Sequence, residues 1–149
     1  MIVNRTLDVS LEEMDVFVKQ MVLQDIYHAT GKKKQLSDVK PGFKYSKKLK
    51  GRSGKEGNVL TCIDELESGN YKASFNSKQG VNTLAYRYQE NAEGKIDLSY
   101  EENYDAKSKS KALNYQIMNF LYKHSNKRRI NLTLAHIEHL IQENRKSVN

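Results

Sequence analysis

The chain is poor in several residues that commonly fix a structure or a chemistry. Its 149 residues include one cysteine, one proline and no tryptophan. A single cysteine excludes an internal disulfide and fits a reducing compartment. No stretch approaches the ~18 apolar residues that a membrane span needs, and the first residues lack the pattern of a signal peptide. We therefore expect a cytoplasmic protein without a membrane span.

Length and charge limit the possibilities further. The length predicts a single domain, residues 1–149, with one hydrophobic core. The formal net charge is +7, but residues 61–105 contain four basic and nine acidic residues, whereas Lys32 to Lys55 contain ten basic residues and one acid. This basic run could attract a nucleic acid, a headgroup surface or an anionic ligand. Its aromatic residues, Phe43 and Tyr45, take the opposite parity from the lysines around them, which argues against nucleic acid.

The first thirty residues predict a strand and then helices. Val3, Leu7 and Val9 share one parity, as in a strand. Ser10 and Glu13 form a capping box, in which each side chain can bond to the other residue's backbone N–H at a helix N-terminus. Apolar residues then recur at spacings of three and four, and we expect two short helices with a break before Gly31. The stripe comprises Met14, Phe17, Val18, Met21, Val22 and Ile26.

The middle of the chain predicts five antiparallel strands. Large residues occupy every second position and polar residues the others, as a sheet with one covered face requires. Turns with glycine separate the segments, so a meander is favoured over crossovers. The covered positions are Phe43, Tyr45 and Leu49; Val59, Thr61 and Ile63; Tyr71, Ala73 and Phe75; Leu84, Tyr86 and Tyr88; and Ile96, Leu98, Tyr100 and Tyr104.

A helical period returns in the last forty residues. Leu113, Ile117, Phe120 and Leu121 are followed by a polar stretch and then by Ile130, Leu134, Ile137 and Ile141. No proline or glycine interrupts this part of the chain, so one long helix is favoured, with a kink near Ser125. Two helices joined by a bend at the polar stretch remain the alternative.

The order of these elements resembles a known architecture. A strand, a helical pair, five antiparallel strands and a long C-terminal helix are similar to the α+β helix-grip or START-like fold of the SRPBCC and polyketide-cyclase superfamily. Within it, the chain resembles an uncharacterised family of short bacterial proteins. The matching residues are Ala29–Lys32, Phe43 with Tyr45, Tyr100–Glu102 and Lys127–Arg129. The resemblance implies a curved six-stranded sheet wrapped around the C-terminal helix, with a cavity between them, but no established activity.

The tyrosines suggest what such a cavity would hold. Six of the nine fall on the covered parity, where each ring buries area and presents one hydroxyl. Filling of an ordinary core by good strand formers is the other interpretation. We predict non-enzymatic binding of a small amphipathic or hydrophobic ligand. The predicted ligand-binding residues are Tyr45, Tyr71, Phe75, Tyr86, Tyr88, Tyr100, Glu102, Leu113, Ile117, Phe120 and Leu121.

Glu102 is the residue that fits an ordinary core least well. Its parity places it inward between Tyr100 and Tyr104, where an ionised carboxylate costs several kcal/mol unless it is paired or wet. The possible partners are Arg5, Lys47, His124 and Arg128. Glu102 would anchor a polar ligand group or transfer protons, unless it simply reaches solvent or forms a structural ion pair.

Other functions are weaker alternatives. A cyclase- or hydrolase-like enzyme could use the same cavity, and the Lys32 to Lys55 face could serve as an interaction or nucleic-acid module. His136 and His139 lie three residues apart on the last helix, but no third ligand is evident, so no metal site is expected. No cofactor is expected either, and the sequence leaves the oligomeric state open.

Overall fold

The computed structural model describes residues 1–50, 56–106 and 127–148, and its centre is one antiparallel sheet. The sheet has six strands in the order β1-β6-β5-β4-β3-β2. The strands are β1 (Ile2–Leu7), β2 (Phe43–Lys50), β3 (Glu56–Glu67), β4 (Asn70–Asn76), β5 (Gly80–Glu90) and β6 (Ile96–Ala106). Strands β2 to β6 form the predicted meander, and β1 pairs with β6 to close the order.

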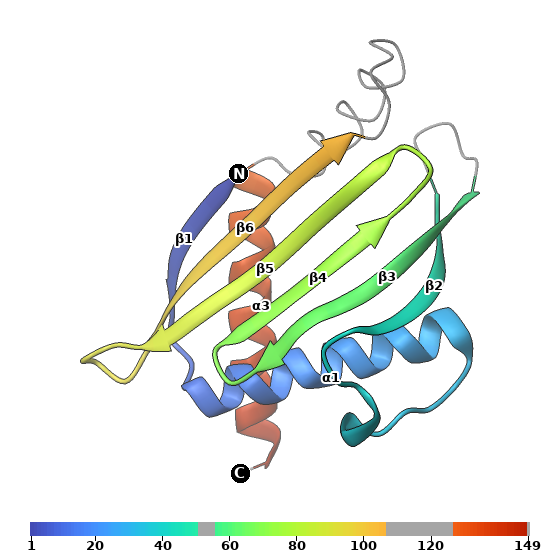
Figure 1. Cartoon of the computed structure of the whole chain (residues 1–149). Coiled ribbons are helices and arrows are strands. Elements are labelled where there is room, and N and C mark those ends of the chain that lie inside the picture. The colour runs from blue at the N-terminus through green and yellow to red at the C-terminus, as the bar shows by residue number, and fades with distance from the viewer. Residues whose placement is uncertain (51–55, 107–126, 149) are drawn as a thin grey trace.

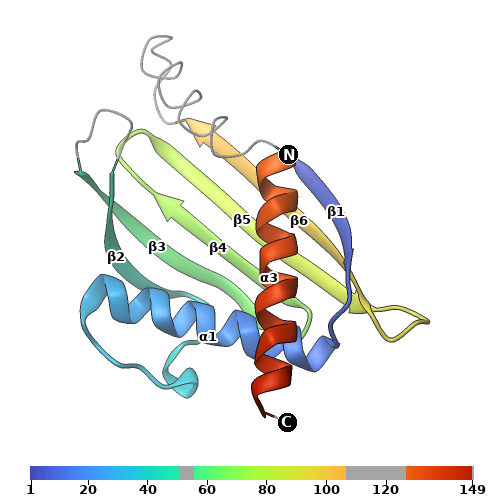
Figure 2. The same cartoon turned by 180° about the vertical axis from the view of Figure 1, so that it is seen from behind.

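Two helices lie on one face of the curved sheet, and this face is called the inner face below (Figures 1 and 2). Helix α1 (Leu11–Thr30) runs across one end of the strands, and α3 (Lys127–Val148) runs steeply across the β1 side. A short 3₁₀ turn, η1 (Leu36–Asp38), follows α1. The α+β helix-grip class that the sequence predicted is therefore confirmed.

Helix α1 differs from the prediction because it is continuous. Its N-terminus carries the predicted capping box: the Ser10 hydroxyl accepts the Glu13 N–H at 3.0 Å, and the Glu13 carboxylate accepts the Ser10 N–H at 2.9 Å. It does not break before Gly31, because the residues up to Thr30 contain no proline or glycine. Gly31 ends it in the left-handed region at φ 72°, where its N–H bonds to the Tyr27 carbonyl.

Alternating residues build the core between sheet and helices. Strand positions with the predicted parity are buried against stripes of α1 and α3. Helix α1 contributes Met14, Val18, Val22 and Ile26, and α3 contributes Ile130, Leu134, Ile137 and Ile141. A register shift between Ile63 and Glu65 lets Ile63 and Leu66 face the same side, although they have opposite parity.

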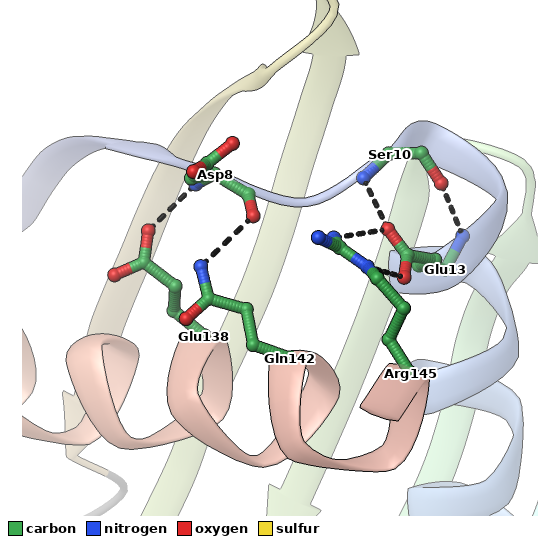
Figure 3. A network of polar contacts seen from close by, with 6 residues as sticks. All are labelled: Asp8, Ser10, Glu13, Glu138, Gln142 and Arg145. Atoms are coloured by element: carbon green, nitrogen blue, oxygen red, sulfur yellow. Dashed lines mark hydrogen bonds and ion pairs between the residues drawn. The ribbon is translucent and has the colours of Figure 1, made fainter. Parts of the chain in front are cut away.

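A polar network fastens α3 to the corner between β1 and α1 (Figure 3). Arg145 donates two hydrogen bonds to the Glu13 carboxylate, at 2.8 and 2.7 Å. Glu138 accepts the Asp8 N–H at 2.6 Å, and the Gln142 amide donates to the Asp8 carbonyl at 3.1 Å. These contacts join the two ends of the chain, and they hold α3 against β1.

Candidate functional site

Three tyrosines form a ladder across the middle of the inner face. The strand register places Tyr71 opposite Tyr86 and Tyr86 opposite Tyr100. Neighbouring ring centroids lie 5.8 and 5.5 Å apart, within the range of favourable aromatic pairs. Each of these side chains is about 5–6% exposed. Parity in the sequence therefore located the ladder correctly.

The hydroxyls of this ladder are hydrogen-bond donors rather than acids. Tyr100 donates to the Glu102 carboxylate at 2.9 Å. Burial, followed by the charge and hydrogen bond of Glu102, raises the pKa of Tyr100 well above its usual value. Burial and the same carboxylate raise the pKa of Tyr86 to about 12, and burial is the main cause of a raised pKa at Tyr71. All three phenols therefore stay protonated near neutral pH.

Two further predicted residues, Tyr45 and Tyr88, use their hydroxyls to dock α1. Tyr45 donates to Asp25, which also accepts a hydrogen bond from the Lys47 ammonium at 3.0 Å. Tyr88 donates to Asp15, near the start of the same helix. Both rings are buried, as their parity in the sequence predicted. Their aspartate partners could not be identified from the sequence, because each contact joins residues distant along the chain.

Lys47 also approaches Phe75, another predicted ligand-binding residue. Its ammonium lies 4.9 Å from the centre of the Phe75 ring, in cation–π distance. Lys47 was one of the proposed partners of Glu102, but its charge is matched by Asp25 instead. This arrangement leaves Phe75 half-buried on the inner face, beside the row that contains Glu102.

Glu102 lies half-buried on the inner face, as its parity predicted. Its two oxygens accept hydrogen bonds from Tyr100 and, at 3.2 Å, from the Asn82 amide. Within residues 1–50, 56–106 and 127–148, no ion pair joins Glu102 to a basic side chain. Arg5 and Arg128, two of its proposed partners, are thus not bonded to it. Each carboxylate oxygen has two lone pairs, so each can accept one hydrogen bond beyond the one described here.

Among the residues that the structure describes, three buried polar side-chain atoms of the inner face have no hydrogen-bond partner. They are Arg5 Nε, Thr61 Oγ1 and Asn82 Oδ1. All three residues occupy inward positions: Arg5 lies between Val3 and Leu7, Thr61 pairs with Tyr45, and Asn82 pairs with Tyr104. Such atoms are rare in folded proteins, and each one costs about 1–3 kcal/mol. Thr61 and Asn82 were not among the predicted site residues, although their inward parity was the available signal in the sequence.

Some predicted residues cannot be placed in this way. Leu113, Ile117, Phe120, Leu121, His124 and Ser125 lie outside the described residues, and so does the kink predicted near Ser125. The basic run is described up to Lys50, where Phe43 and Tyr45 point inward, away from Lys44 and Lys48. In the described ranges, no three His, Cys, Asp or Glu side chains gather as metal ligands would. None of the helices described there has the length and hydropathy to cross a membrane.

Two surface hollows lie away from the tyrosine ladder. One, of about 800 Å³, is on the outer face and is lined by polar residues such as Thr6, Arg87 and Asp97. The other, of about 430 Å³, lies beside the end of α1 and includes Asp25 and Lys47. Neither opens onto the ladder.

Comparison with solved structures gives the same fold. Protein SA2116 of unknown function from Staphylococcus aureus has a TM-score of 0.60 at 17% identity, covering 98% of this chain and 94% of that one. Ara h 8.0201 has a TM-score of 0.61 at 11% identity, covering 96% and 97%. Protein NE0264 from Nitrosomonas europaea has a TM-score of 0.60 at 10% identity, covering 98% and 96%. At such identities the likeness shows the fold alone.

Comparison of the sequence with known proteins identifies the family but no activity. No protein of curated function matches it. A domain of unknown function, DUF3284, matches residues 1–123, which cover all six strands and α1. The chain therefore belongs to the DUF3284 family, and its fold is the helix grip.

Proposed function

We propose that the protein is a START-like domain that binds a small amphipathic ligand at the inner face of its sheet without converting it. The observation that carries this proposal is a set of buried polar atoms that have no partner in the described part of the chain: Arg5 Nε, Thr61 Oγ1 and Asn82 Oδ1, on the same face as the tyrosine ladder. A core that only stabilises the fold gains nothing from such atoms, because apolar residues of the same size would cost less.

The aromatic rings favour a ligand with an apolar part. Tyr71, Tyr86 and Phe75 offer ring surface, and the protonated hydroxyls of Tyr71 and Tyr86 offer donors, whereas the Tyr100 hydroxyl donates to Glu102. Ligand sites in proteins commonly combine such apolar walls with a few convergent polar groups. This combination suits a molecule with an apolar body and one or two polar groups.

The tyrosines favour binding over catalysis. A general acid or base works best when its pKa lies near the pH of the reaction. The pKa values of Tyr86 and Tyr100 move in the opposite direction, since burial and the Glu102 charge raise them. A cyclase- or hydrolase-like enzyme would have to transfer protons without these phenols.

A neutral fluorescent amphiphile, N-phenyl-1-naphthylamine, tests the proposal. We expect a saturable rise of its fluorescence with one site per chain, reversed by decanol. A reporter variant, Leu84→Trp, places the chain's only tryptophan on the inner face, and Thr83→Trp places it on the outer face as a matched control. Binding should change the emission of L84W and leave that of T83W unchanged. Equal changes in both variants, or no saturable binding by the wild type, would refute the proposal.

A further inference from the structure

We propose that the polar end of this ligand is a protonated amine with at least one N–H, bound by Glu102 and Asn82. This inference rests on the proposed function and specifies the chemistry of the same site. It starts from two acceptors, the Glu102 carboxylate and the buried Asn82 Oδ1, which belong to residues joined by the 3.2 Å hydrogen bond from Asn82 Nδ2 to Glu102 Oε1.

The orientation of the Asn82 amide determines what this pair can accept. Its NH₂ group must face the Glu102 carboxylate, because the opposite orientation would place two acceptor oxygens together. The amide oxygen is then left buried and without a donor. Tyr100 occupies one oxygen of Glu102, and its hydroxyl has no further hydrogen to give. Among the described residues, what the site lacks is therefore a donor, and a second acceptor would not satisfy it.

Charge favours a cationic donor over a neutral one. No basic side chain in the described part of the chain forms an ion pair with Glu102, and Lys47, on the same face, is bound to Asp25. The segment that contains the site, residues 61–105, holds nine acidic and four basic residues. An ammonium group would supply both the missing donor and the missing positive charge, and hydrogen bonds to charged groups are the stronger kind.

The aromatic residues around Glu102 suit the same ligand group. On β6, Tyr100 and Tyr104 lie two residues before and after Glu102, and on β5 its cross-strand neighbour Leu84 lies between Tyr86 and Asn82. Ring faces attract cations, and carboxylates beside aromatic rings are a recurring way to hold ammonium groups. The Glu102 charge contributes to the raised pKa of Tyr86, so its field reaches that ring.

An anionic ligand is the competing possibility, because the whole protein carries +7 and Arg5 Nε is unsatisfied. Arg5, however, pairs with Leu98, four residues before Glu102 on β6. An anion bound at Arg5 would leave the Asn82 oxygen and the Glu102 charge unmatched. This possibility is decided by the ligand series below.

The test compares four amphiphiles with the same ten-carbon chain on the wild-type protein by calorimetry. They are decylamine, decanol, decanoate and decyltrimethylammonium, each below its micelle concentration, at pH 7 and ~0.15 M salt to screen long-range attraction. Decylamine is protonated there, since an alkyl ammonium has a pKa near 10.4. We expect it to bind about tenfold or more tighter than decanol and decanoate. Decyltrimethylammonium should bind more weakly than decylamine, because it has no N–H for Asn82.

A pair of variants assigns the preference to a residue. Glu102→Gln keeps an acceptor for Tyr100 but removes the charge, and it should reduce decylamine affinity to the level of decanol while changing decanol affinity less than about threefold. Glu101→Gln, its neighbour on the outer face, is the matched control and should change neither. Folding of both is checked by circular dichroism, and if E102Q does not fold, the wild-type series decides.

The outcomes separate this inference from the proposed function. If decanol or decanoate binds as tightly as decylamine, or if E101Q loses as much affinity as E102Q, the amine inference is wrong and ligand binding stands. If none of the four compounds binds, both proposals fail.

Discussion

Removing the charge of Glu13 should destabilise the protein by about 1 kcal/mol at neutral pH, and the loss should disappear in acid. Glu13 belongs to the capping box of α1 and accepts two hydrogen bonds from Arg145 of α3. The hydrogen bond from Arg145 is the main cause that lowers the Glu13 pKa from 4.5 to about 2. We expect Glu13→Gln to keep the cap and lose the ion pair, and Glu13→Ala to lose both.

The expected loss of stability follows from the pKa shift of Glu13 and from the solvent exposure of its side chain. A difference of about 2.5 pKa units corresponds to an upper limit of about 3 kcal/mol between the charged and neutral forms. The Glu13 side chain is 27% exposed, so solvent screening reduces this to about 1 kcal/mol. The lost cap adds about 1 kcal/mol for E13A. For a chain of this length, each kcal/mol lowers Tm by about 2–4 °C.

The pH dependence has a defined sign. The folded-state pKa of Glu13 lies below its ordinary value, so its contribution is complete above about pH 4.5 and is lost as the pH falls toward 2. Urea unfolding of the wild type and E13Q between pH 7 and 2.5 should show the two free energies of unfolding converge. Glu12→Gln, in the same helical turn, is the control. A difference independent of pH, or an equal loss in E12Q, would show that the Glu13–Arg145 ion pair is not the source of the stability.

Three further predictions concern single sites. Gly69→Ala should destabilise the protein by about 1–3 kcal/mol more than Gly94→Ala in urea unfolding. Both glycines have φ 76°, but only at Gly69 would the new Cβ approach the Tyr88 carbonyl oxygen, at 2.7 Å. Equal losses in the two variants would contradict this prediction. Thr61→Val should raise the unfolding free energy of the ligand-free protein by up to about 1 kcal/mol, since it removes a buried hydroxyl without a partner, and a clear loss would mean that the hydroxyl is bonded. Asp15→Asn should lower the free energy of unfolding by about 1–2 kcal/mol at pH 7. Burial acts to raise the pKa of Asp15, but its hydrogen bonds from Ser68, Tyr88 and Gly69 outweigh burial and lower the pKa. The difference in stability between wild type and variant should therefore shrink only as the pH falls below about 4.

Local patterns in the sequence predicted most of the fold. Alternation located the strands because each strand has one covered face, and the capping box at Ser10 and Glu13 located the start of α1. The break expected in α1 was wrong because no residue there interrupts a helix. The register shift after Ile63 was missed, because a bulge of one residue leaves no clear mark in the alternation of apolar and polar residues along a strand.

The candidate site was predictable only in part. Parity placed Tyr71, Tyr86, Tyr100 and Glu102 on one face, because side chains alternate along a strand. The partners of the polar groups depend on contacts between distant segments, and no local rule indicates them. Asp25 was therefore not foreseen as the partner of Tyr45 and Lys47.

The most direct test of the central claim is a crystal structure of the protein as purified, at a resolution that shows ordered water and small ligands. We expect density for a molecule that is not protein, within hydrogen-bond distance of Asn82 Oδ1 or Glu102 and against the rings of Tyr86 and Tyr100. A structure in which protein side chains fill this space and satisfy both Asn82 Oδ1 and Thr61 Oγ1 would contradict it.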